Sequence, residues 1–201
     1  MSSDDWYRNE DWNDSVEEYF YSKLKRARTQ RDQYLIIQAL TLTDKHPKVS
    51  LCLVDEYFES RKDQFDDVRA LLARAIAFMA LGDLEKCVAT YKEILQREKE
   101  FPKHQTGVYL DYPYLVATQK IESEFTNALD VLNEHIDRLT FPLDHYKWHA
   151  SKAIISSDGS EAKKALEAAK VKRSGFRFHQ DVGLVGKEHE KTIKQLCKIS
   201  T

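Results

Sequence analysis

Glycine and proline are scarce in this chain of 201 residues, which contains 6 glycines and 4 prolines. Turn-rich β-sandwiches and barrels need many such residues, because tight turns use backbone conformations that glycine and proline favour. The chain also has no apolar run near the roughly 20 residues that a membrane-spanning helix requires. These absences favour a helical protein and exclude a predicted transmembrane segment.

Cysteine is also rare, and the three that occur are Cys52, Cys87 and Cys197. An odd, scattered set is typical of free thiols in a reducing compartment, and each one falls on an apparent helix face. The first 14 residues are acidic and have no apolar core of the kind that a secretory signal peptide contains. We therefore expect a cytoplasmic protein with inert, packed cysteines.

The formal net charge is only -2, with 42% hydrophobic and 32% charged residues, which is typical of a globular or repeat protein. Acidic residues concentrate in positions 4–18, and a basic cluster follows in positions 23–31. The two ends are either solvated caps, or the acidic end docks on a basic surface of this chain or of a partner. Because the whole chain is not basic, we expect no nucleic-acid partner.

The clearest pattern spans residues 67–98 and predicts two helices joined by a tight turn. The first helix, over residues 68–81, has an unusually wide apolar face, which predicts cover on more than one side. Gly82 allows the chain to leave this helix, and Asp83 is placed to cap the next one. From Leu84 the apolar residues recur three and four apart, as on one face of a second helix.

This hairpin resembles a tetratricopeptide repeat. In that motif a small residue and an aromatic lie three apart on the first helix, and a similar pair lies four apart on the second. Ala75 and Phe78 match the first pair, and Cys87 and Tyr91 match the second. The chain departs from the motif in two places, since Leu71 replaces its tryptophan and the closing proline is displaced to Pro102.

Residues 162–185 are also similar to the C-terminal part of uncharacterised bacterial repeat proteins. The tetratricopeptide resemblance implies a role in protein–protein binding, without catalysis and without a cofactor.

Other segments read as degenerate copies of the hairpin. The patterns predict further helices at 13–28, 31–44, 48–60, 105–120, 125–139, 145–156, 161–172 and 187–199, with a kink or late start near Pro113. We therefore expect an all-α, tetratricopeptide-like superhelix of about four hairpins, with an extended C-terminal cap and a final helix. The predicted divisions are a partly ordered acidic segment (1–12), a repeat domain (13–173) and a capping segment (174–201). Within the first, at least one of Trp6, Tyr7 and Trp12 should pack on the body.

Few motifs in the sequence carry chemistry. There is no glycine-rich phosphate loop, no G-x-S-x-G and no C-x-x-C. His145 and His149 lie four apart on a predicted helix, which is the spacing of zinc-binding helices, but no third ligand is near. A metal-dependent enzyme built on these two histidines is the less favoured alternative to a binding module. The sequence otherwise predicts no catalytic residue, no metal and no cofactor.

The predicted binding surface is the concave face that the first helices of the hairpins would line. Tyrosine, tryptophan and arginine are the residue types that anchor protein interfaces. For Tyr112 and Trp148 a place in the core is an equally good interpretation. A specific version is an immunity-type protein that neutralises a toxin, and a homodimer is also possible. The residues that we expect to bind a peptide or protein are Arg69, Arg74, Tyr109, Tyr112, Tyr114, Trp148, His149 and Lys152.

Overall fold

The computed structural model describes residues 5–201. In that part of the chain it contains ten α-helices, three short 3-10 helices and no strands, which confirms the predicted all-α class. The chain separates into two compact units, Met1–Thr106 and Gly107–Thr201, and we describe each unit by itself. The predicted single repeat domain over residues 13–173 stays a prediction.

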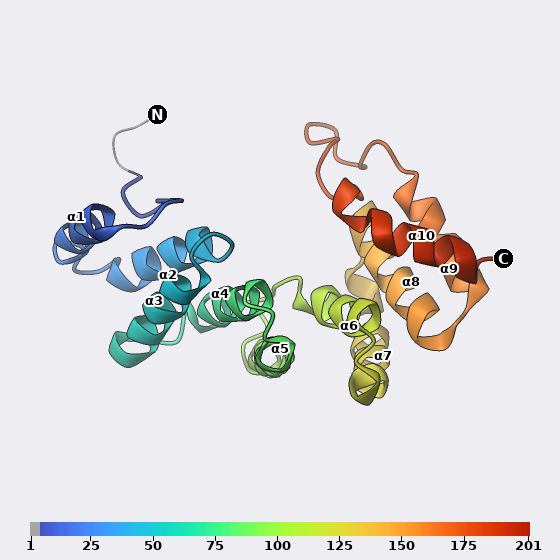
Figure 1. Ribbon diagram of the computed structural model, residues 1–201, viewed down its shortest axis with the longest axis horizontal. Coiled ribbons are helices and arrows are strands. Elements are labelled where there is room, and N and C mark those ends of the chain that lie inside the picture. The colour runs from blue at the N-terminus through green and yellow to red at the C-terminus, as the bar shows by residue number, and fades with distance from the viewer. Residues whose placement is uncertain (1–4) are drawn as a thin grey trace. The chain divides into compact units, whose positions relative to one another are not determined.

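The first unit contains five helices, of which α2 packs on α3 and α4 packs on α5 (Figure 1). Helix α3 also contacts α4, so the two pairs are joined into one body. Their bounds are α1 Asp14–Leu24, α2 Arg31–Leu42, α3 Pro47–Ser60, α4 Asp67–Ala80 and α5 Leu84–Glu100.

The second unit contains the other five helices and two more pairs, α6 with α7 and α8 with α9. Helix α8 also contacts α6, and the last helix, α10, packs on α9 and α8. The bounds are α6 Val108–Gln119, α7 Phe125–Glu134, α8 Pro142–Ser156, α9 Gly159–Ala169 and α10 Glu190–Ile199. Short 3-10 helices occupy Glu122–Glu124, Ile136–Arg138 and Lys187–His189.

The hairpin of α4 and α5 forms as its sequence predicts. Gly82 has φ 76°, a left-handed conformation that glycine adopts without strain, and the Asp83 carboxylate accepts a hydrogen bond from Lys86 N at 3.1 Å. The small residues Ala75 and Cys87 are fully buried between the helices. The apolar face of α4 is narrower than predicted at its end, where Met79 and Leu81 are exposed beside the turn.

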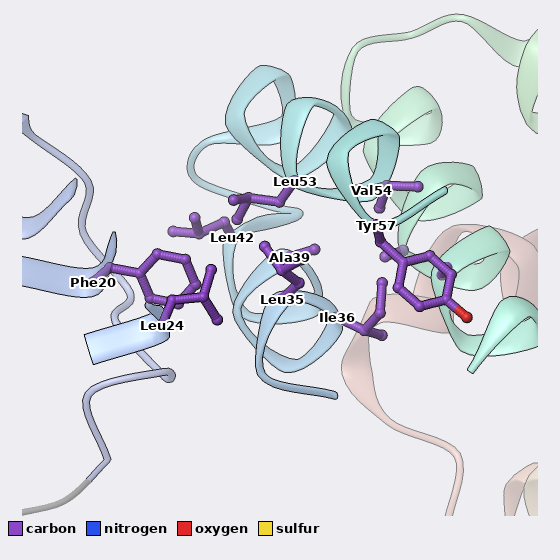
Figure 2. Close-up of a cluster of buried hydrophobic side chains, with 11 residues drawn as sticks. Phe20, Leu24, Leu35, Ile36, Ala39, Leu42, Leu53, Val54 and Tyr57 are labelled. Carbon is purple, nitrogen blue, oxygen red and sulfur yellow. The ribbon is translucent and has the colours of Figure 1, made fainter. Parts of the chain in front are cut away.

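A cluster of large apolar side chains from α1, α2 and α3 forms the core of the first unit (Figure 2). Phe20 and Leu24 of α1 meet Leu35 and Leu42 of α2 there, and all four are buried. The aromatic side chains of the segment before α1 pack against this cluster. The expectation that at least one of these aromatic residues packs on the body agrees with this contact, while the division of residues 1–12 as a separate segment stays a prediction and its first four residues lie outside the described part.

Further local predictions differ from the structure, and the first helix, predicted to run to residue 28, ends at Leu24. Cys52 and Cys197 are exposed, so the prediction that every cysteine lies on a packed face was wrong for these two. Helix α6 begins at Val108 and continues through Pro113, its sixth residue, where the missing N–H affects only one bond of the first turns. Helix α7 ends at Glu134, about one turn before the predicted end, and a 3-10 turn follows. Among residues 5–201, no helix is long and apolar enough to cross a membrane.

Candidate functional site

A pocket of about 550 Å³ lies on the second unit between α8, α9 and the chain that follows α9. Helix periodicity explains the lining of α9, because residues three and four apart share one face. His145 and His149 share a face of α8 for the same reason, with ring centroids 6.5 Å apart and planes inclined by 20°. The pocket is lined by Thr140, Pro142, His145, His149, Lys164, Glu167, Ala168, Val171, Arg173 and Gly175.

The carboxylate of Glu161, which is not itself in the lining, contacts two side chains that are, His149 and Lys164. Glu161 Oε2 lies 2.6 Å from His149 Nδ1, and Glu161 Oε1 accepts a hydrogen bond from Lys164 Nζ at 2.9 Å. Burial acts to raise the pKa of Glu161, but the hydrogen bonds from His149 and Lys164 outweigh it, and the pKa is lowered. An ionised carboxylate only accepts, so His149 Nδ1 carries the proton, and its Nε2 is left for a ligand.

The lining is suited to an anion more than to a cation. It brings together the ammonium of Lys164, the guanidinium of Arg173 and two imidazoles. Two carboxylates oppose them, Glu167 in the lining and Glu161 behind it, and Glu161 already pairs with Lys164, so Arg173 is the cation with the least local compensation. Among residues 5–201, no three histidine, cysteine or acidic side chains cluster as metal ligands. A metal ion would need further ligands and would be repelled by the two permanent cations, so the paired histidines are better suited to contact an acidic group.

An aromatic rim continues from the pocket wall. Phe176 follows Gly175 of the lining and stacks on Phe141 with ring centroids 5.1 Å apart. The next aromatic, Phe178, is 83% exposed, and the guanidinium carbon of Arg177 lies 5.4 Å from its ring centroid. Phe176 and Phe178 are both exposed and follow the lining residue Gly175 closely in the chain.

Backbone hydrogen bonds close the segment that carries this rim. Ser174 N donates to Gln180 O at 2.7 Å, and Ser174 Oγ donates to His179 O at 2.8 Å. Leu143 N of α8 donates to Gly183 O at 2.8 Å, which ties the segment to the helix of the two histidines. The segment is non-helical, as predicted, and its turns place Arg173 and Gly175 at the pocket.

Three of the predicted binding residues lie in the core of the second unit. Tyr109, Tyr112 and Trp148 are 6%, 1% and 5% exposed. Their polar ends have internal partners: Tyr109 Oη donates to Arg138 O, Tyr112 Oη donates to Glu124 Oε2, and Trp148 Nε1 donates to Leu132 O. The three rings are therefore part of the core. For Tyr112 and Trp148 this agrees with the second of the two interpretations that the sequence allowed.

Two other predicted residues of this unit are partly accessible. Lys152 Nζ lies 4.3 Å from the ring centroid of Trp148 and shields that ring. Tyr114 is half-buried, and its hydroxyl lies 2.8 Å from His189 Nδ1 and 3.0 Å from Thr192 Oγ1. Tyr114, His189 and Thr192 line a smaller pocket of about 270 Å³, which shares no lining residue with the larger one. Only His149 of the predicted set lines the larger pocket.

The two predicted arginines belong to the first unit and form ion pairs within it, one with the buried Asp66 and one with the exposed Asp55. Arg69 Nη1 lies 2.9 Å from Asp66 Oδ1, and Arg74 Nη2 lies 2.8 Å from Asp55 Oδ1. The Arg74 guanidinium also packs over the Phe58 ring at 4.7 Å. Partner binding by these predicted residues stays a prediction.

The sequence prediction missed Glu161, Lys164 and Arg173. The i, i+3 spacing of Glu161 and Lys164 was visible, but such pairs are common on solvated helices and carried no sign of a site. Comparison with protein-family models, with curated proteins and with solved structures found no match to this chain.

Proposed function

We propose that this chain is a non-catalytic interaction module of tetratricopeptide-like helical hairpins, and that it binds an acidic segment of another protein. Support for the repeat type comes from the four neighbouring helix pairs and from the buried small residues Ala75 and Cys87 in the central one. The binding surface is the basic pocket on the second unit together with the rim of Phe176 and Phe178.

The observation that carries the proposal is the convergence of two cationic side chains and two imidazoles from separate elements. Helix α8 contributes two imidazoles, α9 contributes Lys164, and the following segment contributes Arg173. Charge-assisted hydrogen bonds to a carboxylate are stronger than neutral ones, and an arginine fork can hold both of its oxygens. The adjoining phenylalanines supply apolar contact area, which a peptide uses and a small free anion does not.

The three thiols support two parts of this proposal: Cys87 supports a role without thiol catalysis, and Cys52 and Cys197 support a reducing compartment, the cytoplasm. Burial raises the pKa of Cys87 to about 11, so its reactive thiolate is scarce at neutral pH. Cys52 and Cys197 are exposed and unpaired, a state that persists where thiols are kept reduced.

The test compares two double variants that each remove two positive charges. Lys164→Gln with Arg173→Gln changes the pocket, while Lys163→Gln with Lys172→Gln changes exposed neighbours that do not line it. Affinities are measured for acidic, neutral and basic synthetic peptides of equal length by fluorescence polarisation.

We expect acidic peptides to bind, and the pocket variant to bind them at least about tenfold more weakly than the control variant. Raising the salt concentration from about 0.1 M to about 0.5 M should weaken this binding further. Equal affinities of the two variants, or no preference for acidic peptides, would overturn the proposal.

A further inference from the structure

The non-helical segment of residues 5–12 packs against side chains of α1 and α2 in the first unit, and we refer to the surface that it covers as the groove. Three of its aromatic side chains, Trp6, Tyr7 and Trp12, are partly buried against the cluster that Figure 2 shows around Phe20 and Leu35. Tyr7 stacks on Tyr34 of α2 with centroids 4.5 Å apart, and Trp6 meets the same ring edge-on at 4.9 Å. Trp12 packs edge-on against Phe20 at 5.5 Å.

The fully buried carboxamide of Gln38 forms hydrogen bonds with the backbone of this segment. Gln38 of α2 is 0% exposed, its Oε1 accepts from Asn9 N at 3.0 Å, and its Nε2 donates to Asn9 O at 2.7 Å. This is the paired N–H and C=O recognition that a neighbouring β-strand provides, here made by one side chain. Gln38 Oε1 also accepts from Asn9 Nδ2 at 3.0 Å.

Without a peptide in the groove, the Gln38 carboxamide would lose these partners inside an apolar stripe of α2. An unpaired buried amide is unfavourable, so the groove is complete only when a peptide backbone occupies it. Two of the three bonds involve backbone atoms of the occupant and do not depend on the identity of the residue at that position, whereas the third is specific to the Asn9 side chain. Another segment can make the same two backbone bonds.

The remaining contacts define what such a segment must carry. Trp12 N donates to His46 Nε2 at 3.2 Å, and Lys45 Nζ lies 3.2 Å from Glu10 and 3.5 Å from Asp11. The groove therefore selects aromatic side chains at its two ends and acidic side chains beside Lys45. The acidic pairs are exposed, with 73% and 82% of the two carboxylate side chains accessible, so salt and water weaken this end of the segment.

We infer that the groove of α1 and α2 is a peptide-binding site that residues 5–12 occupy in cis, and that its partner is a protein segment rich in aromatic and acidic residues. The inference concerns a surface of the first unit and stands whether or not the basic pocket of the second unit binds anything. Occupation in cis lowers the apparent affinity for the partner. A groove that is closed 99% of the time binds about 100-fold more weakly than an open one.

The experiment uses the full chain and a labelled synthetic peptide of residues 5–13, DWYRNEDWN. Trp6→Ala with Trp12→Ala loosens the segment in cis but leaves Gln38, Lys45 and His46 unchanged. We expect this variant to bind the peptide at least about tenfold more tightly than the unmodified chain. A folded variant that binds the peptide no more tightly than a scrambled one would overturn the inference.

Three further variants locate the site, each made in the loosened chain. Gln38→Leu should abolish peptide binding, whereas Gln33→Leu on the exposed face of the same helix should not change it. Lys45 is exposed, so Lys45→Glu leaves the fold intact and should weaken binding about tenfold. A peptide with lysines in place of Glu10 and Asp11 should then recover that loss, and failure of this charge exchange would overturn the proposed orientation in the groove.

A second copy of the chain is the competing occupant, since its own residues 5–12 have the required chemistry. Sedimentation of the unmodified chain over a range of concentrations distinguishes the two. A chain that is monomeric at every concentration supports a separate partner. A dimer that Gln38→Leu dissociates would overturn the inference, because residues 5–12 would then be exchanged between two copies of the chain.

Discussion

Replacing Asp67 with asparagine removes one charge from the most deeply buried ion cluster of the first unit. Asp67 is the first residue of α4 and is 1% exposed. Its carboxylate accepts hydrogen bonds from Tyr57 Oη at 2.9 Å and from Arg97 Nη2 at 3.1 Å, and it forms an ion pair with Arg61, whose Nε lies 2.9 Å away. One side chain therefore connects the end of α3 and the body of α5 to the start of α4.

The expected loss of stability follows from these contacts. Asparagine keeps the shape of the side chain but replaces one accepting oxygen with an NH₂ group that faces an N–H donor. Breaking a buried ion pair by removing one partner costs about 3–5 kcal/mol. Because both arginine side chains remain 24% exposed, water can partly replace the lost carboxylate. We therefore expect the unfolding free energy to fall by about 3 kcal/mol, the lower end of that range.

Urea unfolding followed by circular dichroism measures this change, and Asp55→Asn is the matched control. Asp55 Oδ1 also accepts from an arginine, Arg74, at 2.8 Å, but its side chain is 63% exposed. Exposed pairs contribute about 0–1 kcal/mol, so the control should lose less than about 1 kcal/mol. Equal losses in the two variants would refute the reasoning that burial sets the strength of the cluster.

Three further predictions concern single side chains. At pH 8 a thiol reagent should modify the exposed Cys52 and Cys197 rapidly and Cys87 only after unfolding. The reason is that burial raises the pKa of Cys87 to about 11. Rapid modification of all three thiols in the folded chain would contradict this. Burial, helped by Lys147, lowers the pKa of His189, so the unfolded chain binds more protons and stability should fall as pH drops below about 6.5. His189→Gln should flatten this loss between pH 7 and pH 5 in urea titrations, and an unchanged slope would assign the loss to other groups. Tyr112→Ala should lower the unfolding free energy by about 3–5 kcal/mol and Tyr112→Phe by about 1 kcal/mol, whereas a negligible effect of alanine would mean that the ring is not packed.

The helices were predictable because their signals are local. Apolar residues recur at helical spacing within each segment, and Gly82 with Asp83 marks the central turn by conformational freedom and capping. The predicted boundaries of α4 and α5 lie within about two residues of those observed, as expected for fraying ends. The turn-by-turn geometry of a helix is determined by its own residues, so no knowledge of distant neighbours was needed.

The outward faces of the same helices were harder to predict, since they depend on what packs against them. Cys52 and Met79 are apolar and fall at helical spacing, yet both are exposed. The opposite error affected Tyr112 and Trp148, whose aromatic and hydrogen-bonding groups suit either a core or an interface. Residue type does not distinguish these environments until the neighbouring helices are in place.

The pocket could not be predicted because its parts are distant in sequence. His149 and Glu161 are 12 positions apart and meet only because α8 packs on α9. Arg173 joins them through a non-helical segment whose turns depend on Ser174 and on its contact with α8. The spacing of His145 and His149 indicated a shared face, but the ligand class depends on charges contributed by the other elements.

Gln38 shows how a polar residue in an apolar run carries information that periodicity discards. It follows Leu35, Ile36 and Ile37 and precedes Ala39, and all five side chains are buried. A glutamine in such a run must find hydrogen-bond partners, and a neighbouring helix has none free on its backbone. A non-helical segment does have free N–H and C=O groups, so the buried carboxamide itself points to a peptide backbone. The aromatic residues of the acidic segment, unusual for a free tail, supply the apolar half of the same argument.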